Sequence, residues 1–164
     1  MRCVLTEMYE KQYELDMEIA ENHHISYDET KKQRVLALLV ELGEFANATR
    51  CFKFWSFKPS ESKERVLDEY ADGLHFLLSI GLACDYKVNS IDMDEDVEGD
   101  LVDVILKCYE AVSYFGAHRN LVSYVNMFEA YLKILSKIGY TWSDAYDAYF
   151  AKLLENHHRQ ETNY

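Results

Sequence analysis

Two pairs of acidic residues lie within stretches that otherwise predict buried apolar helix. They are Glu41 with Glu44, in the segment VLALLVELGEFANA, and Glu69 with Asp72, in LDEYADGLHFLLSIGLA. Residues three positions apart share one face of a helix, and buried carboxylates need a compensating partner. Two such helices side by side would gather four negative charges. Hard dications with oxygen ligands, Mg²⁺ or Mn²⁺ as its substitute, are the natural partners for such a group.

The apolar context distinguishes these two pairs from the others. The chain has 29 acidic residues, and pairs with the same spacing, such as Glu61 with Glu64, have polar neighbours and are typical of solvated faces. Buried structural salt bridges are the alternative to a metal site, because a positive side chain also compensates a buried carboxylate. The candidate partners for such bridges are Arg34, Arg50 and Arg65.

A cluster of four carboxylates predicts chemistry at phosphorus. Such a cluster could hold more than one divalent ion, and paired ions suit an in-line displacement because they stabilise the attacking and leaving oxygens together. One carboxylate could then orient or deprotonate the attacking water. We take Glu44 as this catalytic base, although the spacing of the four acids does not decide between them.

A phosphate substrate also needs cationic side chains. Lys152, Asn156 and Arg159 recur at helical spacing near the C-terminus, and Tyr164 is the last residue of the sequence. Arginine and lysine suit outlying phosphate charge. A basic helix end that complements its own dipole is an equally good interpretation of the sequence alone.

A second set of residues could bind a nucleobase. Lys53 and Trp55 combine a positive charge with a ring that can stack, and Gln12 and Asp16 are polar members of an otherwise apolar helix face. His75 follows Asp72 by one helical turn and could donate a hydrogen bond to a ligand or to a carboxylate. A core histidine with satisfied hydrogen bonds fits the same position.

Composition limits the class of protein. The 164 residues are 49% hydrophobic with a formal charge of −12, which predicts one folded domain over 1–164 and argues against contact with nucleic acid backbones. The four cysteines have no C-x-x-C spacing and fit a reducing compartment. The sequence contains neither a signal peptide nor an apolar run of about 20 residues, so we expect a cytoplasmic protein without a membrane segment.

Hydrophobic periodicity and the single proline predict an all-α fold. We expect a bundle of about six helices, four of them forming the core around the metal site. The expected helices cover 4–22, 28–52 with Asp28 as N-cap, 62–85, 99–115, 119–138 and the residues from 141 onward, with 159–164 as a tail. The acidic segment 87–100 is expected to be a loop. Since a short loop joins the second and third helices, they should pack antiparallel and bring the two acidic pairs together.

The sequence resembles the dimeric dUTPases of the all-α NTP pyrophosphatase superfamily, in the short form of Gram-positive bacteria and their phages. Four segments carry the resemblance in order along the chain: Gln12-x-x-Leu15-Asp16, ELGEFANATRCFKFWS from Glu41, EYADGLHFLLS from Glu69, and AYFAKLLENHHRQETNY from Ala148. The central two segments are specific to this group in combination.

The resemblance implies hydrolysis of dUTP, and of dUDP as well, by metal-activated water, with dUMP and pyrophosphate as the products of dUTP, and it implies a homodimer. It assigns Mg²⁺ to four acids: Glu41, Glu44, Glu69 and Asp72. It assigns the nucleoside pocket to Gln12, Asp16 and Trp55, with His75 and Phe76 beside it. It assigns the phosphates and the sugar to Lys152, Asn156, Arg159 and Tyr164.

One departure from the family bears on specificity. Longer relatives have an asparagine where this chain has Asp16, so uracil selection is less firmly implied than pyrophosphatase chemistry. Two alternatives therefore stay open: a pyrophosphatase for another nucleotide such as dCTP, and a helical dimerisation or regulatory module without catalysis.

Overall fold

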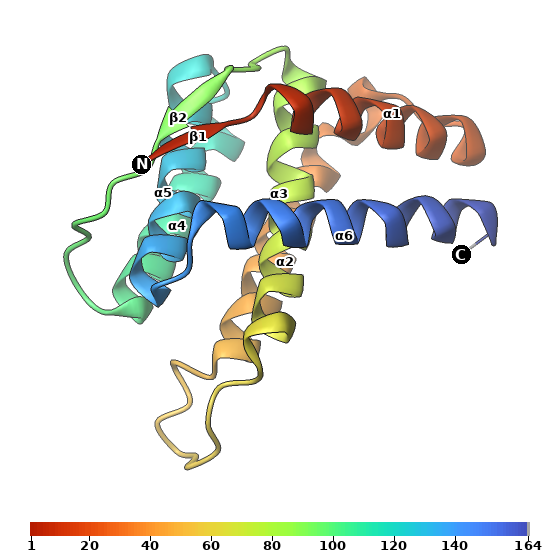
Figure 1. Ribbon diagram of the computed structural model, residues 1–164. Helices are drawn as coiled ribbons and strands as arrows, with labels where there is room; N and C mark the ends of the chain where they lie inside the picture. Colours follow the sequence, from red (N-terminus) through yellow and green to blue (C-terminus); the bar gives the residue numbers. More distant parts are fainter. Residues whose placement is uncertain (164) are drawn as a thin grey trace.

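The fold is a bundle of helices with one small sheet (Figure 1), in a computed structural model that describes residues 1–163. The helices are α1 (Thr6–His23), α2 (Tyr27–Thr49), α3 (Lys63–Cys84), α4 (Leu101–Ala117), α5 (Leu121–Ile138) and α6 (Trp142–Glu161). Two strands, β1 (Arg2–Val4) and β2 (Ser90–Asp92), pair antiparallel. The all-α prediction is therefore confirmed. In the described part of the chain, no helix is long and apolar enough to cross a membrane.

Helix α3 lies at the centre of the bundle and positions the other elements. It runs antiparallel to α2, with which it forms the most extensive helix pair, and it also packs against α1 and α6. Reciprocal hydrogen bonds join it to α5: the Tyr70 hydroxyl donates to the Tyr131 carbonyl at 3.2 Å, and the Tyr131 hydroxyl donates to the Tyr70 carbonyl at 2.8 Å. Buried tyrosines need such partners, so these bonds fix α3 against the core.

Helices α1 and α6 run parallel, and α6 crosses α3 (Figure 1). Three side-chain pairs join α1 to α6 in one register: Tyr146 with Glu7 at 2.5 Å, His157 with Glu18 at 2.6 Å, and Asn22 with Gln160 at 3.3 Å. Residues on α1 therefore meet residues about 139 positions later in the chain. This alignment brings the C-terminal segment beside Gln12 and Asp16.

Three helix ends agree with the boundaries expected at 62, 138 and 141. Ser62 caps α3, Thr141 and Asp144 form a capping box at the start of α6, and Gly139 ends α5 with a φ of 80°. The predicted cap at Asp28 is wrong, because Ser26 caps α2 and forms a capping box with Glu29. The Ser26 hydroxyl accepts from the Glu29 backbone N–H, and the Glu29 carboxylate accepts from the Ser26 backbone N–H, so the helix already begins before Asp28.

Four other features differ from the predictions. The first helix begins after β1, and β2 interrupts the predicted loop 87–100. Helix α2 ends at Thr49, where Arg50 takes a left-handed conformation. Arg159 belongs to α6 rather than to a tail. The strands are only three residues long and bury Cys3 and Ile91, so neither has the length that an alternating pattern needs for prediction.

Gly73 allows the close contact between α3 and α5. A Cβ atom at this position would collide with the hydroxyl and ring of Tyr131, which is fully buried. We expect Gly73→Ala to lower the free energy of unfolding by about 1 to 3 kcal/mol, since the core must shift to accept the methyl group. Urea denaturation measures this change.

Gly116→Ala is the matched control. Its added Cβ would meet Val35 at an ordinary contact distance of 3.5 Å, and alanine favours helix by about 1 kcal/mol over glycine. Equal destabilisation of both variants would contradict the role assigned to the Gly73 contact.

Candidate functional site

Three of the predicted acidic residues converge at the interface between α2 and α3. Glu41, Glu69 and Asp72 each offer a carboxylate oxygen, and these oxygens all lie within 4.8 Å of one another. The antiparallel packing of α2 and α3 produces this arrangement, as expected from their short connection. Three carboxylates at this separation suit the oxygen coordination of a hard divalent cation.

Glu44 lies beside this group rather than within it. Its side chain is exposed one turn after Glu41 on α2. Its charge is nevertheless close enough to contribute to the raised pKa values of Glu41 and Glu69. Glu44 therefore lies apart from the other three acids, although the sequence pattern did not distinguish between the four.

Two basic side chains contact the acidic group. Arg65 pairs with Glu69 and lies 2.9 Å from Asp68, and Lys152 lies 2.7 Å from Asp68 and 3.1 Å from Asp72. The prediction that Arg65 is a salt-bridge partner is therefore confirmed for Glu69. No ion pair or hydrogen bond to Glu41 occurs in residues 1–163, so the cluster is only partly neutralised.

Burial and mutual repulsion favour the protonated forms of these acids. Burial, followed by the charges of Asp72, Glu69 and Glu44, raises the pKa of Glu41 to about 7. Burial also raises the pKa of Glu69 and Asp72, against the opposing effects of Arg65 and Lys152 respectively. A site in which partly buried carboxylates repel one another attracts an added cation, because the cation reduces this repulsion.

A cavity of about 420 Å³ adjoins the acidic group. Residues of α1, α2, α3 and α6 line it, so four helices surround the site as predicted. Its walls include Glu41 and Asp72 at the acidic end. They also include most of the predicted substrate-binding residues: Gln12, Asp16, His75, Phe76, Asn156 and Arg159. The volume falls within the range of small-molecule sites.

Asp16 is the acceptor at the centre of a buried hydrogen-bond network. It is 3% exposed and accepts hydrogen bonds from Gln12 Nε2 at 3.0 Å, from the Tyr27 hydroxyl at 2.9 Å and from the Ser79 hydroxyl at 2.7 Å. Arg34 lies 3.8 Å from Asp16 and donates to Ser79. Burial raises the pKa of Asp16, and these donors and the Arg34 charge oppose the rise. Asp16 therefore acts as a buried anchor for this end of the cavity.

The Asp16 carboxylate orients Gln12 and His75. Since an ionised carboxylate only accepts hydrogen bonds, Gln12 must direct its amide nitrogen toward Asp16. Its Oε1 then faces His75 Nδ1 at 2.6 Å and the Tyr149 hydroxyl at 3.1 Å. Burial lowers the pKa of His75 to about 3, so the ring is neutral and Nδ1 carries its proton. The expected donation from His75 is thus directed at Gln12.

The C-terminal residues are arranged along α6. Lys152 reaches the acidic group, whereas Asn156 and Arg159 line the cavity. Arg159 also contacts Glu155 and lies 3.4 Å from Asn156. Tyr164 lies outside the described residues, so its predicted contact with the substrate stays a prediction.

Lys53 and Trp55 are not brought to this cavity. They lie in the connection between α2 and α3, which extends away from the bundle (Figure 1), and neither lines the cavity. Trp55 is 64% exposed. Within one chain the structure therefore separates these two residues from the other predicted substrate-binding residues.

Four residues at or beside the site were not predicted from the sequence to lie there: Tyr27, Arg34, Ser79 and Asp68. Arg34 was named only as a possible partner of an acidic pair. Ser79 follows Asp72 and His75 at helical spacing, a signal that could have identified it. Asp68 precedes Glu69 and bridges Arg65 and Lys152, a contact that depends on the crossing of α3 and α6 and has no local signal.

Comparison with known families identifies the chain. A family model described as dUTPase matches residues 4–164. The chain belongs to the dUTPase family. No curated protein matches the chain significantly. The match covers both acidic pairs, the cavity and the C-terminal segment, and it agrees with the resemblance found in the sequence.

Membership of the dUTPase family establishes the reaction. The chain is a dUTP diphosphatase, which hydrolyses dUTP to dUMP and pyrophosphate. The reaction of the family therefore takes precedence over the two alternatives that the sequence left open, a non-catalytic module and a dCTP pyrophosphatase. The acidic group and the adjoining cavity are then the candidate active site of the dUTPase.

The raised pKa values predict how stability of the metal-free dUTPase depends on pH. Folded Glu41 keeps its proton up to about pH 7, whereas an unfolded glutamate loses it near 4.5. The folded state therefore binds more protons between these values, and the free energy of unfolding falls as pH rises through this window. Denaturant titrations in chelator, from about pH 5 to about pH 8, measure the slope.

Glu41→Gln supplies the control for this measurement. The amide cannot ionise, so the variant should lose less stability than the natural protein as pH rises. Identical slopes for the two proteins would show that Glu41 is not the titrating group.

Proposed function

We propose that this dUTPase is a Mg²⁺-dependent enzyme and that Glu41, Glu69 and Asp72 hold the metal, with Glu44 beside them. The proposal is carried by one observation, the convergence of three carboxylate oxygens within 4.8 Å of one another. The raised pKa values of all three acids support it, because a bound cation would relieve their repulsion. Mn²⁺, which also accepts oxygen ligands, is the expected substitute.

The substrate would lie between the cavity and the acidic group. Gln12, His75 and Phe76 are proposed to hold the uracil and the sugar, with Asp16 as the anchor beneath Gln12. Lys152, Asn156, Arg159 and Tyr164 are proposed to contact the phosphates and the sugar. The adjacency of Glu41 and Asp72 to the cavity supports this orientation, since the nucleoside would occupy the cavity and the triphosphate would extend toward the acids.

Glu44 is proposed as the catalytic base. A bound Mg²⁺ would offset phosphate charge and make water a better nucleophile. Glu44 would accept the proton as water adds to phosphorus, and the phosphoanhydride bond would break to release pyrophosphate and dUMP. Its exposed position and its electrostatic influence on Glu41 and Glu69 support this role. Because dUDP also contains a phosphoanhydride bond, we propose it as a second substrate.

A homodimer is also part of the proposal. Large apolar side chains are exposed on α2, on α4 and in the connection after α2: Leu36, Val40, Phe54, Trp55, Phe57, Leu106 and Tyr114. An apolar hollow between the end of α2 and α4 extends this surface. Exposed apolar surface of this kind is typical of protein interfaces. Contact of Lys53 and Trp55 with the nucleotide would then require a second subunit or another arrangement of their loop.

A cytoplasmic location completes the proposal. The four cysteines, Cys3, Cys51, Cys84 and Cys108, are free thiols. Thiols of this kind fit a reducing compartment.

Glu44→Gln tests the catalytic base. The variant should fold normally and bind a non-hydrolysable dUTP analogue, while kcat falls by about 10² to 10⁴, the contribution typical of general base catalysis. Steady-state kinetics and calorimetric binding measure the two effects. The exposed Glu64, which lies on α3 outside the acidic group, provides the control: Glu64→Gln should keep full activity. Normal kcat in Glu44→Gln would exclude Glu44 as the base.

Removal of divalent metal tests the dependence on Mg²⁺. The protein in excess chelator should not hydrolyse dUTP, and added Mg²⁺ should restore the full rate. Glu41→Gln and Asp72→Asn should require higher Mg²⁺ concentrations for half-maximal rate, because each loses one anionic ligand. Undiminished turnover in chelator would contradict the metal proposal.

A further inference from the structure

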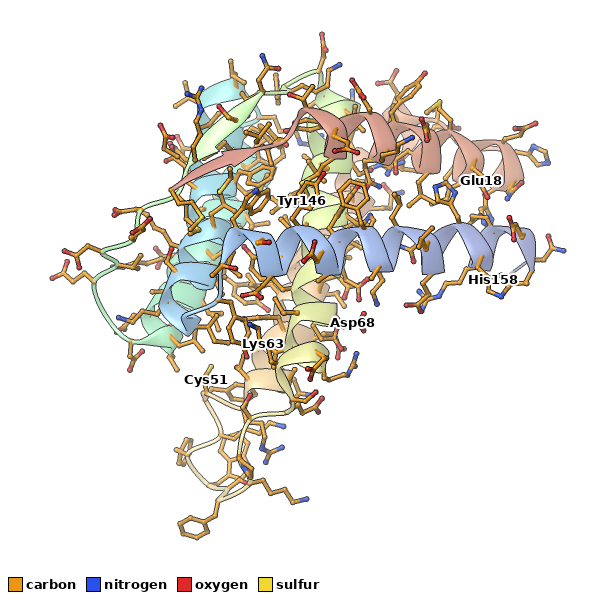
Figure 2. The ribbon with its side chains drawn as sticks, viewed as in Figure 1. Glu18, Cys51, Lys63, Asp68, Tyr146 and His158 are labelled. Atoms are coloured by element: carbon orange, nitrogen blue, oxygen red, sulfur yellow. The ribbon has the colours of Figure 1, made fainter. Side chains whose placement is uncertain are left out.

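Lys152 is a nearly buried ammonium group that bridges two carboxylates with different environments. It is 4% exposed. Its Nζ lies 3.1 Å from Asp72, which belongs to the convergent acidic group, and 2.7 Å from Asp68, which does not. Figure 2 places Asp68 on α3 beside the crossing of α6. Lys152 thus contacts the proposed metal site and a second anion at its edge.

Asp68 has a corresponding contact with Arg65. One Asp68 oxygen accepts from Lys152, and the other accepts from Arg65 at 2.9 Å. Arg65 also pairs with Glu69. Two of the three convergent acids are therefore paired with a basic side chain, and both of these side chains also pair with Asp68.

A divalent ion at the acidic group would compete with these basic side chains. The Asp72 and Glu69 carboxylates attract a divalent ion less strongly while they are paired with Lys152 and Arg65. A buried ammonium cannot simply lose its partner either, because an unpaired buried charge is costly. Asp68 offers Lys152 a carboxylate that takes no part in the convergent group, so Lys152 can stay paired when Asp72 binds an ion.

We infer that Lys152 is an internal cation that competes with divalent metal for Asp72, and that Asp68 is the positioning residue that retains Lys152 when the metal binds. This inference rests on the proposed metal site. It assigns a role to Asp68, which neither lines the cavity nor belongs to the group of three convergent acids. It also keeps an ammonium group at the edge of the site, where the phosphates of dUTP would lie.

Calorimetric titration with Mg²⁺, in the absence of nucleotide, tests the inference. Lys152→Met keeps the length of the side chain and removes its charge, so Mg²⁺ should bind about tenfold more tightly. Asp68→Asn should weaken Mg²⁺ binding by about three- to tenfold, because Lys152 then has only Asp72 and Glu155 as nearby acids. Circular dichroism and thermal unfolding check that each variant folds.

The double variant separates competition from simple electrostatics. If Asp68 acts through Lys152, Asp68→Asn should change Mg²⁺ affinity by less than about twofold in the Lys152→Met background. If Asp68 acts only by its charge, the two changes should add. Additive effects would overturn the inference, and so would unchanged Mg²⁺ affinity in Lys152→Met.

Two further measurements keep the inference testable. Glu41→Gln tests the metal site itself. If this substitution does not weaken Mg²⁺ binding, the proposed site is refuted. If it weakens binding but the Lys152 and Asp68 effects are additive, only this inference is refuted. Should Lys152→Met fail to fold, the ammonium signal of Lys152 in the natural protein can be followed by NMR. It should shift with Mg²⁺ and remain hydrogen-bonded, and an unshifted signal would contradict competition.

Discussion

Repulsion among the carboxylates of Glu41, Glu69 and Asp72 is the constraint that the rest of the site must satisfy. Helices α2 and α3 bury Glu69 and partly bury Glu41 and Asp72 at their interface, where the reduced dielectric strengthens the repulsion. Their hydrophobic contacts outside the acidic stripe hold the two helices together despite it. The cations of α3 and α6 reduce the net charge without removing it. The same repulsion that destabilises the folded chain would therefore be the source of the proposed affinity for a divalent ion.

The other end of the cavity, where the nucleoside is proposed to bind, follows a different principle. There a single buried anion, Asp16, is surrounded by donors from α1, α2 and α3. Because an ionised carboxylate only accepts hydrogen bonds, Asp16 determines the orientation of Gln12 and, through it, which ring nitrogen of His75 carries the proton. The acidic end of the cavity thus holds carboxylates that are only partly compensated, whereas the carboxylate at the Gln12 end is surrounded by donors. One cavity connects the two.

The sequence allowed the fold class, the three convergent acids and about half of the residues that line the cavity to be predicted. The apolar periodicity around Glu41 and Glu69 was sufficient to predict the acidic group, because carboxylates in such a context are rare unless a partner compensates their charge. The pairing of Lys152 with Asp68 could not be predicted, since it depends on how α6 crosses α3, more than 80 residues earlier in the chain. The cap at Ser26 was predictable from the Ser-x-x-Glu pattern that ends at Glu29. Strands β1 and β2 were not, because each is three residues long and its partner is 88 residues away.

Gly73 has a consequence for how the site tolerates change elsewhere. It immediately follows Asp72, and its missing side chain lets Tyr131 of α5 rest against the α3 backbone. Tyr131 therefore sets how closely α3 approaches α5, and with it the position of the α3 acids, because Glu69 lies one helical turn before Gly73. A substitution in α5 that moves Tyr131 would shift Glu69 and Asp72 without altering any acidic residue. Relatives that differ at this contact would for that reason differ in the spacing of the carboxylates, even with every acid retained.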